Sequence, residues 1–320
     1  MSVQILGTGS YLPENIVTND DLAKIVDTSD EWISSRTGIR ERRISSKEMT
    51  TAMAAEAAKR ALLHSGKKPE DIDFIIVATL SADHATPNTA CQVQEILGAD
   101  RAVCFDLSAA CSGFIYALNT AKAYMDTGLA STVLVIGAET LSKMVDWEDR
   151  STCVLFGDGA GAAVVTGRED GLYETVMGSN GKKGFALTCG ERKLHNPLSR
   201  QETKLDQIYM DGQEVFRFAV TTAPHCIKET LEKAGIEKEE VRYYILHQAN
   251  LRIIKSVAKR LKEPEIKFPY DVDKIGNTSS ASIPILLDEM NQEGKLCRGD
   301  KIILCGFGGG LTWGAILLEW

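Results

Sequence analysis

The chain repeats one arrangement of helices, strands and glycines, and this internal repeat restricts its fold more than any other feature. Gly66 and Gly235 each end a helical pattern just before a strand pattern, and they lie 169 residues apart. Gly137 and Gly306 end the next apolar strands at the same offset. A constant offset of this size indicates two copies of one supersecondary unit. We therefore expect two similar halves, residues 1–170 and residues 171–320.

The repeat also relates two polar positions. The segment from Cys111 to Gly128 and the segment from Asn277 to Gly294 both span 17 residues. This offset of 166 residues predicts that Cys111 and Asn277 begin equivalent helices. Pseudo-twofold symmetry between the halves would bring the two side chains together at one site.

Short apolar runs alternate with amphipathic patterns along the chain, which is typical of the α/β class. Most of these runs are continuous, as expected for strands that are covered on both faces. The predicted strands are residues 3–7, 74–79, 103–107, 132–137, 161–166, 243–246, 301–306 and 315–319. The predicted helices include residues 51–65, 112–127, 213–234 and 251–262.

Composition and charge exclude several classes of protein. The eight cysteines are scattered without a CxxC pair, so neither a disulfide framework nor a zinc site is expected. The net charge of −8 argues against general binding to nucleic acid or to an anionic membrane. No run approaches the roughly 18 apolar residues of a membrane span, and the first residues lack the pattern of a secretion signal. We expect a cytoplasmic protein.

One cysteine lies where an apolar strand pattern gives way to a long apolar helix pattern. Cys111 follows residues 103–107 directly and is flanked by Ala110 and Ser112. A helix N-terminus presents unpaired N–H groups and about half a positive charge. This position is expected to lower the thiol pKa and favour the thiolate, which attacks carbonyl carbon. The alternative interpretation is a small buried apolar residue, as most cysteines are.

Three other segments are ambiguous when each is taken alone. His247 follows an apolar strand, at the edge where α/β sheets bind ligands, but a histidine there can equally cap or pack. Asn277 opens a turn of small residues that is also a good helix N-cap cluster. The run from Gly308 to Gly310 lets backbone N–H groups approach a bound oxyanion closely, or simply makes a tight turn.

Together these segments carry a specific resemblance. The motifs ACSGF at Cys111, HQANLRI at His247, GNTSSAS at Asn277 and FGGGLTWGA near the C-terminus closely resemble those of the β-ketoacyl-acyl-carrier-protein synthase III family. Residues 7–14, 27–44 and 156–164 match the family as well, so the resemblance covers nearly the whole chain. It implies a thiolase-like fold, with two pseudo-symmetric halves in an αβαβα sandwich, and a homodimer. It also implies the condensing activity that begins type II fatty-acid synthesis.

The resemblance implies a role for each candidate. Cys111 would take an acyl group from acyl-CoA, and His247 and Asn277 would stabilise the enolate formed when malonyl-carrier protein loses CO₂. The backbone N–H groups of Cys111 and Gly309 would form the oxyanion hole. Neutral donors suit this task, because the charge develops only in the transition state. No metal or bound redox cofactor is implied.

The resemblance also implies a binding site for coenzyme A. Trp32 and Arg36, with Arg150 nearby, match positions that hold the adenine and its phosphate, and an indole with a guanidinium partner suits that task. An ordinary core tryptophan is the alternative, although residues 29–31 around Trp32 are polar. The implied CoA contacts are Thr28, Trp32, Arg36, Arg150, Gly212, Phe216 and Asn250.

A basic helix is predicted beside His247. Residues 249–262 contain five basic residues and no acidic one, and the apolar residues share one helical face. On a chain of net charge −8, such a helix is either a solvated surface or a docking site for an acidic partner. The family binds its acidic carrier protein here, with Arg252 as the leading contact. The implied carrier contacts are Gln248, Ala249, Asn250, Leu251, Arg252, Lys259 and Arg260.

Thr86 marks a departure from family members restricted to acetyl primers, which often carry a bulky aromatic residue there. In the family this position lines the acyl pocket across the dimer interface, so a small residue predicts room for longer or branched primers. A related condensing enzyme of polyketide or quinolone synthesis is the main alternative. A thiolase, a cysteine hydrolase and a non-catalytic carrier-binding protein fit Cys111, His247 and Asn277 less well.

Overall fold

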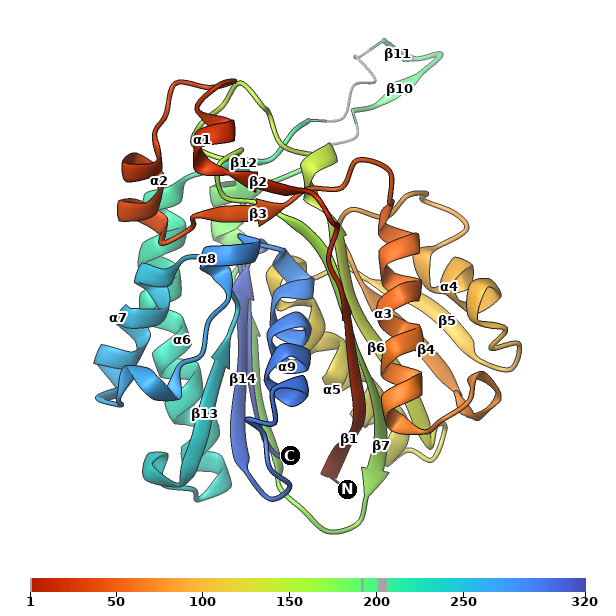
Figure 1. Ribbon diagram of the computed structural model, residues 1–320. Helices are drawn as coiled ribbons and strands as arrows, with labels where there is room; N and C mark the ends of the chain where they lie inside the picture. Colours follow the sequence, from red (N-terminus) through yellow and green to blue (C-terminus); the bar gives the residue numbers. More distant parts are fainter. Residues whose placement is uncertain (1, 191–192, 201–205) are drawn as a thin grey trace.

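Two β-sheets lie side by side with helices on both faces of each, which gives five alternating layers (Figure 1). The computed structural model describes residues 2–190, 193–200 and 206–320. Helices α6 (Gly212–Ala234) and α7 (Leu251–Leu261) form one outer layer. Helices α3 (Thr50–Ser65) and α4 (Thr89–Leu97) form the other. Helices α5 (Gly113–Asp126) and α9 (Ser282–Gln292) lie between the sheets. The layering confirms the αβαβα sandwich.

The first sheet has the strand order β1-β7-β6-β4-β5. Strand β4 is parallel to β5 and β6, whereas β7 is antiparallel to β1 and β6. Every residue of β6 is buried, as the continuous apolar run predicted. The strand bounds are β1 Ser2–Tyr11, β4 Phe74–Ala78, β5 Val103–Leu107, β6 Thr132–Thr140 and β7 Asp158–Arg168.

The second sheet has the order β13-β14-β15-β8 and repeats the strand directions of the first. Strands β13 (Val241–Leu246), β14 (Lys301–Gly308) and β15 (Thr312–Glu319) confirm three predicted strands. Strand β8 (Tyr173–Ser179) was missed, because only Val176 of its seven residues is buried. The boundary expected between residues 170 and 171 falls in the connection from β7 to β8.

Two helices, one in each half, end in the same way, as the repeat predicts. Helix α3 ends at Ser65 and α6 at Ala234, and each is followed by a glycine in the left-handed region. Gly66 has φ 68° and Gly235 has φ 65°, a conformation that glycine adopts without the strain of a Cβ atom.

The expected equivalence of Cys111 and Asn277 is wrong by three residues. Short 3₁₀ turns, Ala110–Ser112 and Ser279–Ala281, precede α5 and α9 respectively. The first residue of each turn has a φ angle in the left-handed region, 45° at Ala110 and 49° at Ser279. The structural counterpart of Cys111 is therefore Ser280. The prediction aligned Gly128 with Gly294, which follow the ends of α5 and α9. Because α9 has 11 residues and α5 has 14, this alignment gives an offset that is three residues too short.

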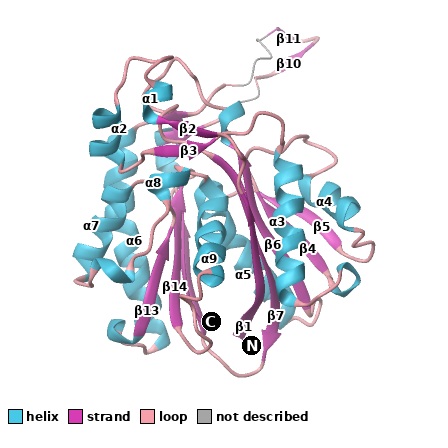
Figure 2. Ribbon diagram, in the orientation of Figure 1, coloured by secondary structure: helices cyan, strands magenta, loops and turns pink. Residues whose placement is uncertain are grey.

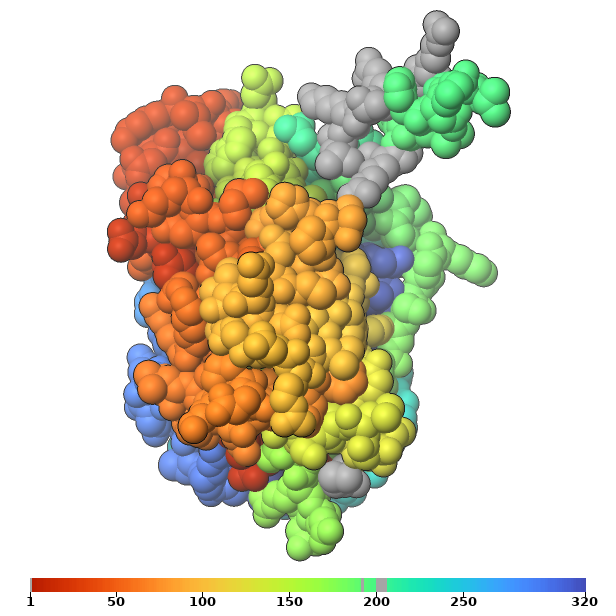
Figure 3. Space-filling view, turned by 90° about the vertical axis from the view of Figure 1, so that its right-hand side faces the viewer, coloured from red at the N-terminus to blue at the C-terminus, as the bar shows by residue number. Residues whose placement is uncertain are grey.

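Short elements gather at one end of the sandwich, at the top in Figure 2. They are β2 Ile16–Thr18, α1 Asn19–Leu22, α2 Asp30–Thr37, β3 Glu41–Arg43, β9 Leu187–Thr188, β10 His195–Asn196, β11 Ser199–Arg200, β12 Tyr209–Met210 and α8 Val272–Ile275. The α3–α4 face covers the first sheet from outside (Figure 3). Among the described residues, no helix is both long and apolar enough to cross a membrane.

Candidate active site

A cavity of about 1070 Å³ opens beside the turn that carries Cys111. Its wall combines segments of both halves. Residues 79–85, 105–106 and 108–111 come from the first half, and residues 187–190, 309–310 and 312 come from the second. Cys111 and Ser279 both line it. The cysteine thus lies where the two halves meet over a hollow large enough for a small ligand.

Gly308, a glycine that the sequence analysis did not single out, packs directly against Cys111. A Cβ atom on Gly308 would lie 2.7 Å from the Cβ and 3.0 Å from the Sγ of Cys111. Strand β14 therefore packs this closely against Cys111 only because residue 308 has no side chain. The run of three glycines was the available signal, but it was interpreted through Gly309 alone.

The thiol of Cys111 departs from the expected behaviour. Its side chain is buried, with 7% of the residue exposed. Burial raises the pKa of the Cys111 thiol to about 12, although the nearby Ser279 side chain opposes the shift. The expectation of a lowered pKa is therefore wrong for the free protein, because the loss of water around the thiol outweighs the hydrogen bonds that favour the thiolate. The thiol is protonated at neutral pH.

Asn277 is fixed through its backbone to the first half of the chain. Its N–H donates to the Leu155 carbonyl at 2.8 Å, and its carbonyl accepts from the Gly157 N–H at 3.0 Å. The side-chain Oδ1 accepts from the Ser279 N–H at 2.9 Å. One turn therefore orients both the Asn277 amide and the serine that faces Cys111.

His247 continues the edge of β13. Its N–H donates to the Cys305 carbonyl at 2.8 Å, and its ring packs edge-on against Phe307 with centroids 5.4 Å apart. Burial lowers the pKa of His247 to about 3, so the imidazole is neutral at physiological pH.

Ser282 connects His247 to the same turn. Its Oγ lies 2.7 Å from His247 Nδ1 and 2.9 Å from the Ser279 carbonyl oxygen. The hydroxyl has one proton for these two acceptor positions, so it takes part in setting the imidazole tautomer. Cys111, His247 and Asn277 are thereby linked through residues 279–282, which the sequence analysis interpreted only as a possible N-cap cluster.

Gly309 lines the cavity beside the same turn. A Cβ atom placed on it would lie 3.3 Å from the Ala110 Cβ, so the backbone of residue 309 runs close to the residue before Cys111. Such an approach suits an N–H donor aimed at a ligand on Cys111. The assignment of the Cys111 and Gly309 N–H groups to an oxyanion hole stays a prediction.

Trp32 lies between two arginines at the surface. The Arg36 guanidinium carbon is 4.7 Å and that of Arg150 is 5.2 Å from the centroid of the half-buried indole. Arg150 also donates to the Asp27 backbone oxygen at 2.8 Å, next to Thr28. The three residues predicted to hold an adenine and its phosphate are thus neighbours.

Helices α2 and α7 meet next to this group. Asn250 Nδ2 donates to the Arg36 carbonyl at 3.2 Å, and Asn250 Oδ1 accepts the Arg252 N–H at 2.8 Å as the N-cap of α7. The Arg252 guanidinium carbon lies 5.6 Å from the centroid of Phe216 in α6, the helix that Gly212 begins. The predicted CoA and carrier contacts therefore adjoin at one surface.

Helix α7 is amphipathic as predicted. Its exposed basic residues are Arg252, Lys255, Lys259 and Arg260, of which Lys255 pairs with Glu265 at 3.4 Å. Ala249 and Leu251 are partly exposed.

Gln248 corrects the predicted docking set, because it is fully buried. Its amide donates to the Leu246 carbonyl and accepts from the Asp271 N–H. No part of Gln248 is available to a docking protein.

Thr86 is exposed and does not line the cavity of this single chain, although Ala85 and Asn88 on either side of it do. Its predicted contact with an acyl group requires a second copy of the chain and stays a prediction.

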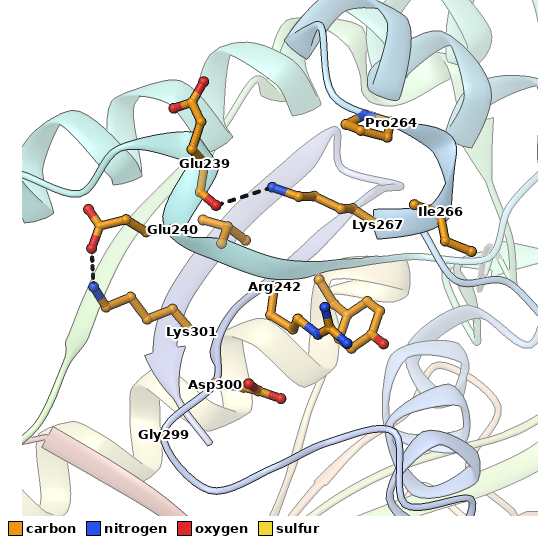
Figure 4. A pocket seen from close by; sticks show the side chains of 11 residues that line it. Glu239, Glu240, Arg242, Pro264, Ile266, Lys267, Gly299, Asp300 and Lys301 are labelled. Atoms are coloured by element: carbon orange, nitrogen blue, oxygen red, sulfur yellow. Dashed lines mark hydrogen bonds and ion pairs between the residues drawn. The ribbon is translucent and has the colours of Figure 1, made fainter.

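A second hollow, of about 470 Å³, lies at the opposite ends of β13 and β14, around Arg242 (Figure 4). Lys301 pairs with Glu240 there, and Lys267 donates to the Glu239 backbone oxygen at 3.4 Å. Its lining contains no cysteine, serine or histidine. The chemistry of the described residues therefore points to the cavity at Cys111. Within the same residues, no group of three or more histidine, cysteine or acidic side chains could hold a metal ion.

Two matches to known families cover much of the chain. Residues 105–181 match the family described as 3-oxoacyl-[acyl-carrier-protein (ACP)] synthase III, and residues 231–320 match its C-terminal domain. The β-ketoacyl-[acyl-carrier-protein] synthase III of Clostridium acetobutylicum is 53% identical over 321 residues, which is 100% of this chain and 99% of the relative.

Solved structures agree with these matches. The 3-oxoacyl-[acyl-carrier-protein] synthase III of Aquifex aeolicus has a TM-score of 0.93 and 51% identity, with 100% of both chains covered. The Thermus thermophilus synthase III has a TM-score of 0.93 and 44% identity, covering 99% of this chain and 98% of the other. The priming β-ketosynthase of the R1128 polyketide pathway reaches 0.93 at 37% identity, over 99% and 96% of the chains. The higher identities favour the fatty-acid enzymes over the polyketide alternative.

Proposed function

This chain belongs to the β-ketoacyl-[acyl-carrier-protein] synthase III family and is an acyl-transferring condensing enzyme of fatty-acid biosynthesis, and we propose that it joins a short acyl-CoA primer to malonyl-carrier protein through a thioester on Cys111. The observation that carries the proposal is the turn at residues 279–282. Through it, a buried thiol beside a large cavity is connected to a neutral imidazole and a carboxamide from the other half.

The first half-reaction is acyl transfer. Cys111 Sγ attacks the carbonyl carbon of acyl-CoA, the carbon–sulfur bond to CoA breaks, and the thiol proton of Cys111 ends on the CoA sulfur. Because the pKa of the buried thiol is raised, the proton leaves as the new bond forms, rather than from a standing thiolate. The N–H groups of Cys111 and Gly309 are assigned to the tetrahedral oxyanion, where losing one donor typically costs on the order of 10²–10³ in rate.

The second half-reaction is decarboxylative condensation. The bond from the malonyl α-carbon to its carboxylate breaks, CO₂ leaves, and the resulting enolate attacks the acyl carbonyl on Cys111. The thiolate is expelled and takes up one proton from solvent, which balances the loss of the malonyl carboxylate as CO₂. Donors from His247 and Asn277 stabilise the enolate oxygen. This role requires a proton on His247 Nε2, which leaves Nδ1 as an acceptor. In this state the Ser282 hydroxyl would turn from the Ser279 carbonyl oxygen and donate to Nδ1 instead. The balanced reaction uses no redox cofactor or metal.

The surface around Trp32 is proposed to bind the CoA nucleotide. An indole flanked by two guanidinium groups offers stacking to adenine and positive charge to its phosphates. Stacking of a base on an aromatic side chain contributes about 1–3 kcal/mol. The proposed contacts are Thr28, Trp32, Arg36, Arg150, Gly212, Phe216 and Asn250.

Helix α7 and the residues just before it are proposed to dock the carrier protein. Its basic side chains are exposed next to the CoA surface, so a phosphopantetheine arm and CoA would enter by one route. Arg252 leads the proposed set, which comprises Ala249, Asn250, Leu251, Arg252, Lys259 and Arg260. Complementary charge on an acidic partner would raise the association rate at low salt.

Three further expectations form part of this proposal. The enzyme is a cytoplasmic homodimer, Thr86 of one protomer reaches the acyl pocket of its partner, and residues 1–170 and 171–320 are its two halves. The small Thr86 side chain then leaves space for primers longer than acetyl. Turnover of hexanoyl-CoA and isobutyryl-CoA alongside acetyl-CoA supports this space, whereas strict acetyl preference refutes it.

Mass spectrometry after incubation with acyl-CoA tests the proposed intermediate. The expected adduct has the mass of one acyl group and maps to the Cys111 peptide. It disappears in Cys111→Ala and persists in Cys297→Ala, which removes an exposed cysteine as a matched control. An adduct on another residue, or none at all, overturns the mechanism.

A further inference from the structure

Glu139 is a carboxyl group that the mechanism leaves unused, although it lies beneath the active site. It is the second-last residue of β6 and is fully buried. Its Oε2 accepts hydrogen bonds from Ser81 Oγ at 2.5 Å, the Leu80 N–H at 3.2 Å and Thr79 Oγ1 at 3.3 Å. All three donors belong to the segment that forms one wall of the cavity. One oxygen of Glu139 therefore holds this wall.

The other oxygen of Glu139 reaches into the second half of the chain. Oε1 lies 2.7 Å from Ser280 Oγ, in the turn between Asn277 and α9. Ser280 is 1% exposed, and a Cβ atom on Gly137 of β6 would lie 2.2 Å from its carbonyl oxygen. The backbone of Ser280 therefore packs directly against β6. Glu139 joins the two halves at the level of the nucleophile.

The hydrogen bonds around Ser280 indicate that the Glu139 carboxyl group is protonated and therefore uncharged. Ser280 Oγ lies within 2.8 Å of the Ala78 carbonyl oxygen as well as 2.7 Å from Glu139 Oε1, and its hydroxyl has one proton. If that proton goes to Ala78, which can only accept, the bond to Glu139 requires a proton on the carboxyl group. Burial raises the pKa of Glu139 in the same direction.

The position of Ser280 gives this contact its significance. Ser280 is the counterpart of Cys111 in the second half, so the duplicated turn presents its side chain to Glu139 rather than to the cavity. Its neighbour Ser279 faces the Cys111 thiol and donates its N–H to Asn277. A displacement of Ser280 would therefore move Ser279, which faces the Cys111 thiol, and Asn277, which is proposed to act on the malonyl group.

Resting on the proposed function, we propose that Glu139 is a positioning residue that uses Ser280 to hold the Asn277–Ser282 segment in register with Cys111. The carboxyl group acts through its reach and its neutral donor, not through a negative charge. A misplacement of about 1 Å at reacting groups can lower a rate by about 10²-fold, so small losses of register are expected to be costly.

Three variants distinguish the effect of the length of the Glu139 side chain from the effect of its charge. Glu139→Gln keeps the length and a neutral donor, and malonyl-carrier protein decarboxylation should stay within about threefold of wild type. Glu139→Asp is one methylene shorter and cannot hold both Ser81 and Ser280, so kcat for decarboxylation should fall roughly 10–100-fold, with KM within about twofold. Ser280→Ala should reproduce this loss, and combining it with Glu139→Asp should add little.

Thr230→Val is the matched control, because Thr230 is equally buried and its hydroxyl donates only to the Cys226 carbonyl within α6. It should decarboxylate like wild type. Near-wild-type rates in Glu139→Asp and Ser280→Ala overturn the proposal, and so does an equal loss in Glu139→Gln and Glu139→Asp. A wild-type protein that forms no acyl adduct on Cys111 refutes the proposed function instead, so the two failures are distinguishable.

Discussion

Replacing Gly308 with alanine adds one methyl group against Cys111, the proposed nucleophile. The new Cβ would lie 2.7 Å from Cys111 Cβ, 3.0 Å from Sγ and 3.3 Å from the Cys111 nitrogen. Gly308 has no left-handed φ, so alanine suits its backbone and the contact alone produces the effect. Its pairing with Thr312 holds β14 in place. The strain must therefore be relieved mainly at Cys111.

The distances set the size of the effect. Carbon atoms pack best at about 3.5–4.0 Å, so the 2.7 Å contact requires a movement of about 1 Å. Overpacking of this kind typically costs about 1–3 kcal/mol of stability. A 1 Å displacement of a reacting atom can cost about 10²-fold in rate. We expect a folded Gly308→Ala protein whose Cys111 acylates about 100-fold more slowly.

Intact-protein mass spectrometry at timed intervals after acyl-CoA addition measures this rate, and thermal unfolding measures the stability. Gly181→Ala is the control, because a Cβ there meets nothing within 4 Å and Gly181 also lacks a left-handed φ. It should acylate at the wild-type rate. A Gly308→Ala protein that acylates as fast as the control would refute the contact between β14 and the nucleophile as a determinant of reactivity.

Three further predictions address the other groups. His247, with its pKa lowered to about 3 by burial, stays neutral as the pH falls, so decarboxylation should show no acidic limb between pH 8 and pH 5; a limb near the ordinary histidine value of about 6.5 would contradict this. Arg252→Glu should raise KM for malonyl-carrier protein about tenfold at low salt and less at high salt, whereas the exposed Arg242→Glu at the far end of β13 should not; equal effects would contradict the docking site. Trp32→Ala should weaken acyl-CoA binding about tenfold but leave acylation by an acyl-pantetheine thioester, which lacks adenine, unchanged; equal loss with both donors would contradict stacking.

The sequence predicted the buried strands well, and the physical reason is their setting. Strands such as β6 are covered on both faces, so their apolar runs are continuous and easily recognised. Strand β8 lies at the edge of its sheet and is mostly partly exposed, and its mixed sequence was missed. Helix α2 was missed because it is short and largely polar, with only Ile33 and Thr37 buried.

The site was predictable only in part. The residue types of Cys111, His247 and Asn277 and the turns around them are visible in the sequence. The contact of Gly308 with Cys111 joins residues almost 200 positions apart, and Glu139 meets Ser280 across 141 positions. No local pattern contains such contacts. The same holds for the pKa of the Cys111 thiol, because a helix end can be inferred from sequence but loss of water at the thiol cannot.

A comparison of two variants in both half-reactions tests whether a nucleophile from one half of the chain and two donors from the other serve separate half-reactions. Acyl adduct formation and CO₂ release from malonyl-carrier protein are measured for Cys111→Ala and for Asn277→Ala. We expect Cys111→Ala to release CO₂ without forming an adduct, and Asn277→Ala to form the adduct with CO₂ release lowered at least tenfold. Loss of both half-reactions in both folded variants, or CO₂ release that is unaffected in Asn277→Ala, would contradict this expectation.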